Sequence, residues 1–191
     1  MLAAVSLLAD AKVDAISWGG TSAGWLGLES DYKLCEAIES EFGIPVWTST
    51  LALVECLHLL GDPTTGLVTP YIAEMNQAIR GTFGSVGITI AQHDRYLGIT
   101  DNQEIGAVGS EKLSGMVDEV LTANDGLRVV MIFCTNLSGA DLALASEAKY
   151  RERDLILLDS VTAVVWGLLR KVGVTTHGTG VAQKWGRVFD L

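Results

Sequence analysis

Residues 127–139 read Leu-Arg-Val-Val-Met-Ile-Phe-Cys-Thr-Asn-Leu-Ser-Gly, an apolar run that ends at Cys134. The part from 129 to 133 is continuously apolar, which is typical of a strand covered on both faces of a parallel sheet. Cys134 then opens a polar turn, and the carboxyl ends of parallel strands are where α/β proteins place reactive groups. The sequence therefore predicts a site at Cys134, with a thiol in front of free backbone amides.

A second predicted strand, residues 13–18, ends in a comparable turn at 19–24, which reads Gly-Gly-Thr-Ser-Ala-Gly. After both turns the order is helix, strand, helix and a closing glycine. We interpret this agreement as an internal duplication, although two unrelated α/β units would show the same order by chance. In the duplicated framework, Gly20 occupies the position of Cys134.

Strand-like and helix-like segments alternate along the whole chain. This order predicts an α/β fold with parallel sheets flanked by helices. We expect two pseudo-symmetric domains, residues 1–64 with 175–191 and residues 65–174, with the active site in the cleft between them. The predicted strands are 13–18, 44–47, 66–69, 88–91, 128–133 and 155–158, and the predicted helices are 30–42, 50–60, 71–83, 110–123, 138–150 and 161–172.

Composition disfavours several classes of function. The 191 residues carry 13 Lys and Arg against 23 Asp and Glu, a net charge of −10. Such a chain, with no basic cluster, is a poor partner for nucleic acid. No stretch approaches the roughly 20 apolar residues of a membrane span, so we expect no membrane partner. The apolar N-terminus lacks the basic region of a signal peptide and is interpreted as a helix that leads into the first strand.

The three cysteines form no CxxC pair, and an odd count argues against a disulfide framework or a zinc site. We therefore expect a cytoplasmic chain with free thiols and no bound metal. Cys35 and Cys56 fall inside helical patterns and are interpreted as core residues, whereas Cys134 lies at a strand end. The acidic, apolar-rich composition permits a homo-oligomer without requiring one.

The two turns have the chemistry of an anion site. Backbone amides that follow a strand and open a helix converge on negative charge, and the side chains of Thr21, Ser22, Thr135 and Asn136 add donors. Donors in this arrangement would hold a carboxylate and stabilise an enediolate, while the Cys134 thiol could deliver or remove a proton. The structural alternative for Thr21 and Ser22 is helix capping.

A competing motif lies in the first turn. Residues 20–24 match G-x-S-x-G, the nucleophile elbow of α/β-hydrolases, with Ser22 as nucleophile. Asp159 and His177 follow in the order of a hydrolase triad. An elbow needs earlier strands, however, and only about one strand precedes Ser22. His177 is better interpreted as a solvated loop residue.

The chain resembles the aspartate/glutamate racemase superfamily, and within it the arylmalonate decarboxylase and maleate isomerase branch. The resemblance covers nearly the whole chain. It rests on five segments in order, Gly-Thr-Ser-Ala at 20–23, Val-Thr-Pro-Tyr-Ile-Ala-Glu-Met-Asn at 68–76, Leu-Gly-Ile-Thr-Asp-Asn at 97–102, Phe-Cys-Thr-Asn at 133–136 and Trp-Gly-Arg-Val-Phe-Asp at 185–190.

The resemblance implies a cofactor-free site for a small carboxylic acid, between two similar domains. Racemases and isomerases of this kind carry a cysteine on each side, whereas arylmalonate decarboxylases have Gly-Thr-Ser in place of the first. Gly20 and Cys134 match the decarboxylase pattern. By that similarity Thr21, Ser22 and Tyr71 help to bind the carboxylate, and Cys134 protonates the enediolate that remains when carbon dioxide leaves.

The resemblance also places Ala23, Asn102 and Ile105 in the pocket wall. A decarboxylase has an apolar residue where Asn102 stands, so a more polar substrate is indicated. The resemblance implies a further strand and helix of about 50 residues at the start of the family fold, and because this chain starts after them we expect the first domain to be N-terminally incomplete. The alternatives are therefore a racemase or cis-trans isomerase of a small acid, a Ser22 hydrolase, or an inactive truncated member.

Overall fold

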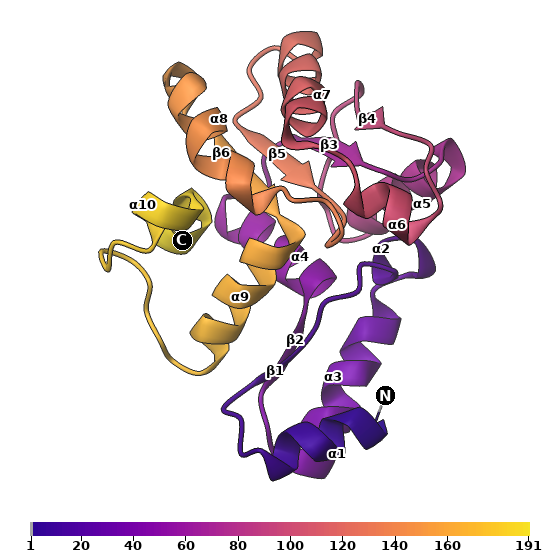
Figure 1. The fold of residues 1–191 in the computed structure, drawn as a ribbon, viewed down its shortest axis with the longest axis vertical. Helices are drawn as coiled ribbons and strands as arrows, with labels where there is room; N and C mark the ends of the chain where they lie inside the picture. Colours follow the sequence, from indigo (N-terminus) through magenta and orange to yellow (C-terminus); the bar gives the residue numbers. More distant parts are fainter. Residues whose placement is uncertain (1) are drawn as a thin grey trace.

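Two parallel sheets organise the structure, which is a computed structural model and describes residues 2–191. The smaller sheet pairs β1 (Ile16–Trp18) with β2 (Val46–Thr48), and the larger sheet has the order β4-β3-β5-β6. Figure 1 shows the two sheets toward opposite ends of the molecule. The strands of the larger sheet are β3 (Thr65–Thr69), β4 (Arg95–Tyr96), β5 (Val129–Ile132) and β6 (Ile156–Asp159), and every neighbouring pair is parallel. The predicted α/β class is confirmed.

Helices flank both sheets. α7 packs on β3, β4 and β5, α8 packs on β6, and α3 packs on β2. The described helices are α1 (Leu2–Asp10), α2 (Ala23–Leu26), α3 (Glu29–Phe42), α4 (Ser49–Leu59), α5 (Ala73–Gly84), α6 (Asn102–Gly106), α7 (Ser110–Ala123), α8 (Ala143–Lys149), α9 (Ser160–Lys171) and α10 (Ala182–Trp185), with 3-10 turns η1 (Ala140–Leu142), η2 (Arg151–Arg153) and η3 (Arg187–Asp190).

The central strands are buried along their whole length. Every residue of β3, β5 and β6 is buried, which explains why these segments are mostly apolar and do not alternate with polar residues. α4 and α9, the helices that follow β2 and β6, pack against each other. Gly167 of α9 permits a close approach to β2, because a Cβ there would lie 2.6 Å from Cδ1 of Trp47.

One predicted strand is wrong. Residues 88–91 form only a single bridge, between Ile90 and Thr65, and the edge strand β4 begins at Arg95. The physical reason is Arg80 of α5, whose guanidinium donates to the carbonyls of Ile90, Ala91 and Gln92. Carbonyls that bind a side chain are withdrawn from a strand ladder.

Two helices begin later than their sequence pattern predicts. The helix expected over 71–83 starts at Ala73, because Pro70 and Tyr71 belong to the turn that follows β3. The helix expected over 138–150 starts at Ala143, after the 3-10 turn η1. Both shifts lengthen the turns that follow β3 and β5, and these turns hold the predicted site residues.

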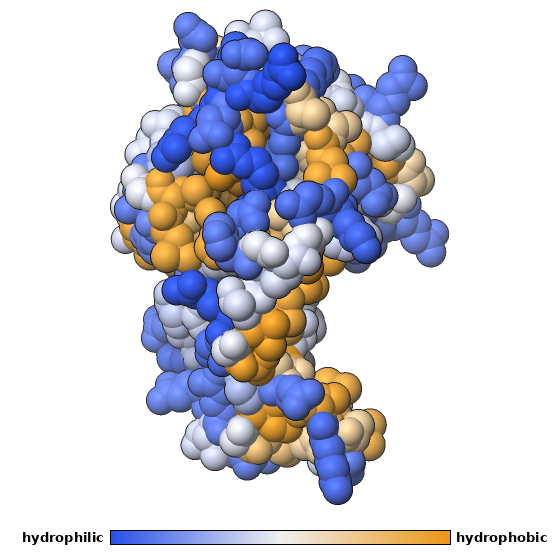
Figure 2. Space-filling model, turned by 90° about the vertical axis from the view of Figure 1, so that its left-hand side faces the viewer, coloured by the Kyte–Doolittle hydropathy of each residue, from blue (hydrophilic) through white to orange (hydrophobic). Residues whose placement is uncertain are grey.

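The smaller sheet has a free edge. Among residues 2–191, β1 pairs with β2 alone, whereas β5, its predicted counterpart, is flanked by β3 and β6. Beside this edge an apolar groove of about 460 Å³ runs between Ala15 and the face of α9 that carries Val165 and Val172. Figure 2 shows apolar surface on the narrower half of the molecule.

The C-terminal tail packs on the larger sheet: α10 contacts α8, and η3 contacts β6 and α9. The division into residues 1–64 with 175–191 and residues 65–174 stays a prediction. Within residues 2–191, no helix has the length and apolar character needed to cross a membrane.

Candidate active site

Tyr71 and Cys134 follow the carboxyl ends of β3 and β5, so both lie at the end of the larger sheet where these strands finish. The two strands are neighbours with Val68 opposite Ile132, and Phe133 N donates to Val68 O at 2.9 Å. The turns that follow them must therefore start side by side. Cys134 is only 4% exposed and is a free thiol, as the sequence predicts.

A hydrogen bond joins the turn after β1 to the turn after β3. Thr21 Oγ1 lies 2.9 Å from the hydroxyl oxygen of Tyr71, and both side chains are buried. Burial raises the pKa of Tyr71 above its ordinary value, and the neighbouring Cys134 raises it further. Tyr71 therefore keeps its proton and remains a hydrogen-bond donor. This contact places the Thr21 turn next to the Cys134 thiol.

Tyr71 is fixed from several directions. The Trp25 ring meets its ring edge-on, with centroids 4.9 Å apart and planes at 66°. Its backbone N–H donates to Thr69 Oγ1 at 3.3 Å, and Thr69 Oγ1 in turn donates to Asn76 Oδ1 at 2.7 Å. A hydroxyl held in this way is a preorganised donor, which does not need to reorient when charge develops beside it.

The turn after Cys134 is closed by Leu137 N, which donates to Cys134 O at 3.2 Å. Its Thr135 is half-buried and its Asn136 is exposed. Asn136 Nδ2 donates to Asn102 Oδ1 at 3.1 Å, so Asn102 lies beside the thiol turn. Ile105, on the same short helix as Asn102, is buried.

Gly20 is covered by an aromatic ring. A Cβ at position 20 would lie 2.6 Å from Cε2 and Nε1 of Trp18. Ala23 and Gly24 are buried behind the turn, and a Cβ at Gly24 would lie 2.5 Å from the Phe133 ring. Trp18 and Trp25 were not singled out from the sequence, where the only signal is a tryptophan on either side of a glycine-rich turn.

The hydrolase triad is not assembled. His177 is 75% exposed and its Nδ1 lies 3.1 Å from the Asp190 carbonyl oxygen. Asp159 Oδ1 instead accepts from Val161 N at 2.8 Å and Thr162 N at 3.1 Å, as the cap of α9. Ser22 stands directly before α2 and makes no side-chain capping bond, and Thr21 bonds to Tyr71, so the capping interpretation of this pair is not supported.

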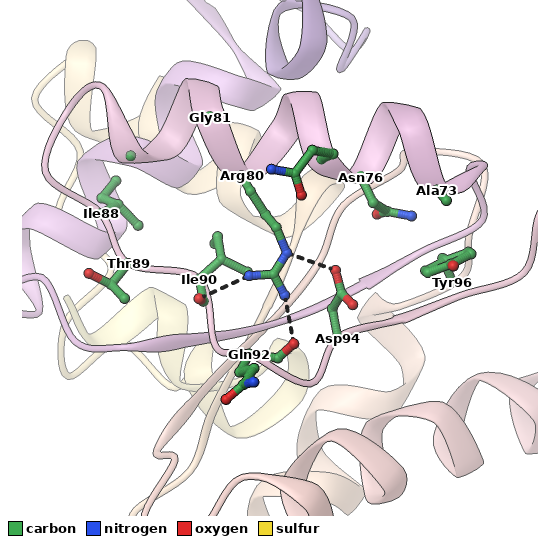
Figure 3. A pocket seen from close by; sticks show the side chains of 12 residues that line it. Ala73, Asn76, Arg80, Gly81, Ile88, Thr89, Ile90, Gln92, Asp94 and Tyr96 are labelled. Atoms are coloured by element: carbon green, nitrogen blue, oxygen red, sulfur yellow. Dashed lines mark hydrogen bonds and ion pairs between the residues drawn. The ribbon is translucent and has the colours of Figure 1, made fainter.

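A large cavity lies away from Cys134. It measures about 740 Å³ and is bounded by α5 and the segment 88–96. Figure 3 shows Arg80 reaching into it, with dashed lines to Ile90, Gln92 and Asp94. The guanidinium is thus occupied by a carboxylate and backbone carbonyls, and it serves to hold the segment 90–94 against α5 rather than to bind an anion.

The protein has an α/β fold in which the turns after β1, β3 and β5 meet around the Cys134 thiol. A family model described as arylmalonate decarboxylase matches residues 1–188, and the chain belongs to this family. It is 29% identical over 139 residues to a maleate isomerase of Nocardia farcinica, covering 72% of this chain and 53% of that protein. A maleate isomerase of Alcaligenes faecalis is 28% identical over 142 residues, with 73% and 53% covered. The chain spans about half the length of these relatives.

Solved structures share the fold. A liganded double mutant of arylmalonate decarboxylase superposes with a TM-score of 0.85 at 21% identity, covering 97% of this chain and 77% of that one. A mutant maleate cis-trans isomerase of Nocardia farcinica, with a covalently bound succinylcysteine intermediate, gives 0.83 at 22% identity, with 97% and 75% covered. The expected membership of the arylmalonate decarboxylase and maleate isomerase branch is confirmed.

Proposed function

We propose that the protein is a cofactor-independent enzyme that decarboxylates a substituted malonate, with Cys134 as the proton donor. The observation that carries the proposal is the buried Thr21–Tyr71 hydroxyl pair beside the Cys134 thiol. Family membership supports a decarboxylase or an isomerase that acts next to a carboxylate.

The reaction follows from the positions of the donors. One carboxylate of the malonate would accept hydrogen bonds from Thr21, Tyr71 and the amides after Cys134. When the bond to the second carboxylate breaks, carbon dioxide leaves and the electron pair forms an enediolate, which these donors stabilise. The Cys134 S–H then donates its proton to the α-carbon, and the thiolate takes a proton from solvent. Ser22, Thr135 and Asn136 remain proposed ligands of the same carboxylate.

A second candidate reaction is cis-trans isomerisation of a small unsaturated dicarboxylic acid. Thiol addition across the double bond leaves a single bond that can rotate, and elimination of the thiol restores the alkene in the trans form. The polar Asn102–Asn136 pair beside the thiol favours this alternative, because a second charged carboxylate would find hydrogen-bond donors there. The curated relatives named as maleate isomerases point the same way.

The Cys134→Ala variant tests the proposal. We expect carbon dioxide release from aryl- and alkylmalonates to fall by at least about 10³-fold, because no other thiol of the described chain lies at the strand ends. Cys35→Ala is the matched control: this thiol is also buried, and burial raises its pKa to about 11, but it lies on α3. Equal turnover by the wild type and Cys134→Ala would refute the role of the thiol.

The same variants separate the two reactions. Incubation with maleate and detection of fumarate by proton NMR reports isomerisation, whereas malonate turnover reports decarboxylation. Wild-type activity on maleate alone, lost in Cys134→Ala, would select the isomerase. Activity on neither class in the wild type would reject both reactions for this chain.

A further inference from the structure

Trp18 is the last residue of β1, and its indole ring folds forward over Gly20. The ring atoms Cε2, Nε1 and Cζ2 lie 2.6, 2.6 and 2.7 Å from where a Cβ of residue 20 would stand. Cβ atoms in proteins almost never make contacts under 3.0 Å, so the ring takes up the space that a side chain at position 20 would need. The alternation of an extended chain explains the contact, because residues two apart point to the same face.

The covered position adjoins the proposed site. Gly20 precedes Thr21, whose hydroxyl bonds to Tyr71 beside Cys134. Trp18 is nevertheless 38% exposed, so one part of the ring rests on Gly20 and another part faces open space. Burying that remaining apolar surface under a bound substrate would be favourable.

We propose that Trp18 is a specificity-determining residue that closes the Gly20 side of the site, so that the reacting carbon receives its proton only from Cys134. The inference rests on the proposed decarboxylation. Without a side chain at position 20 that side would be open to water, which could protonate an enediolate from either face. A flat ring over the glycine excludes that water and offers a stacking surface to the substituent of the acid.

Stereochemistry is the direct readout. Decarboxylation of α-methyl-α-phenylmalonate removes one of two identical carboxylates, and the face of protonation decides which enantiomer forms. We expect the wild type to give one enantiomer in large excess. Trp18→Ala should bring the ratio toward 1:1, and Trp18→Phe should keep most of the excess, because its ring also covers the glycine. Trp185→Ala is the matched control, since Trp185 is also half-exposed but lies on α10.

A thiol at position 20 gives a second readout. Gly20→Cys alone should racemise the pure product acid slowly, because Trp18 occupies the space of the new side chain. In the Trp18→Ala background the same change should raise racemisation at least about tenfold, measured as loss of enantiomeric excess with deuterium uptake at the α-carbon in D₂O. An unchanged enantiomeric ratio in Trp18→Ala, or full racemisation by Gly20→Cys alone, would overturn the inference.

A double-mutant cycle of melting temperatures tests this inference independently of the proposed function. Gly20→Ala should lower the Tm by several degrees in the wild type, because its methyl group meets the indole, and much less in Trp18→Ala. If the wild type fails on every malonate, the proposed function is rejected, and the cycle still decides whether Trp18 closes over Gly20. An equal loss of Tm in both backgrounds would show that it does not.

Discussion

Tyr71 connects the two halves of the proposed site. It comes fifty positions after its hydrogen-bond partner Thr21, and the Trp25 ring and Thr69 hold it in place. Because burial and Cys134 raise its pKa, the hydroxyl stays protonated well above neutral pH. Its proposed task is to donate a hydrogen bond to the carboxylate oxygen that becomes negative in the reaction.

Tyr71→Phe removes this donor and little else. We expect kcat/KM on the active substrate to fall by about 10²–10³-fold, the range seen when one oxyanion donor is lost. Steady-state kinetics measure the change, and Tyr32→Phe on the exposed face of α3 is the matched control. A loss below about threefold would remove Tyr71 from the proposed site.

Asp159, the N-cap residue of α9, has a buried carboxyl group. Asp159 is 1% exposed, and its Oδ1 caps the helix while its Oδ2 has no hydrogen-bond partner. Burial raises the pKa of Asp159 from 3.8 to about 6. The folded state therefore binds this proton more tightly than the unfolded state. Protonation of Asp159 stabilises the fold below the unfolded pKa, and this stabilisation is lost as the pH rises through about 6.

Asp159→Asn should remove this pH dependence and keep the helix cap. Relative to the wild type, the variant should gain about 2–3 kcal/mol of unfolding free energy between pH 4 and pH 7, from a shift of about two units at roughly 1.4 kcal/mol each. Urea titrations at pH 4, 5.5 and 7 measure the difference, with Asp125→Asn at a fully exposed position as control. Parallel curves for the wild type and Asp159→Asn would contradict the expectation.

At the scale of the whole molecule, one carboxylate holds the C-terminal tail. Glu147 of α8 is buried and accepts from Leu157 N of β6 at 3.1 Å. Both of its oxygens also accept from Arg187 N in the tail, at 3.2 and 3.1 Å. Burial raises the pKa of Glu147, and the backbone donors oppose that rise.

Glu147→Ala should loosen the tail. We expect the unfolding free energy to fall by about 1–3 kcal/mol, because backbone donors are left without a buried acceptor. Trypsin should also cut at Lys184 faster than in the wild type, as mass spectrometry would show. Glu119→Ala, which breaks only a surface ion pair with Arg95, should change stability by less than about 1 kcal/mol. Unaltered cleavage at Lys184 would show that other contacts hold the tail.

The sequence predicts the structure correctly where the physical signal is local. The apolar runs of β3, β5 and β6 predicted buried parallel strands, and Cys134 was predicted at a strand end. The prediction failed at residues 88–91, whose strand-like pattern is overridden by Arg80, a residue on a preceding helix. The strand-like pattern of these residues carries no sign that the guanidinium of the preceding helix will bind their carbonyls.

The sequence by itself determined the alternation of strands and helices, and with it the α/β class and the thiol after β5, because periodicity and strand burial are written along the chain. Only the tertiary structure decided which groups meet that thiol. The Thr21–Tyr71 bond joins different strand ends, and the cover of Trp18 over Gly20 depends on the direction of a side chain. Such contacts depend on packing and rotamers, which a linear pattern does not specify.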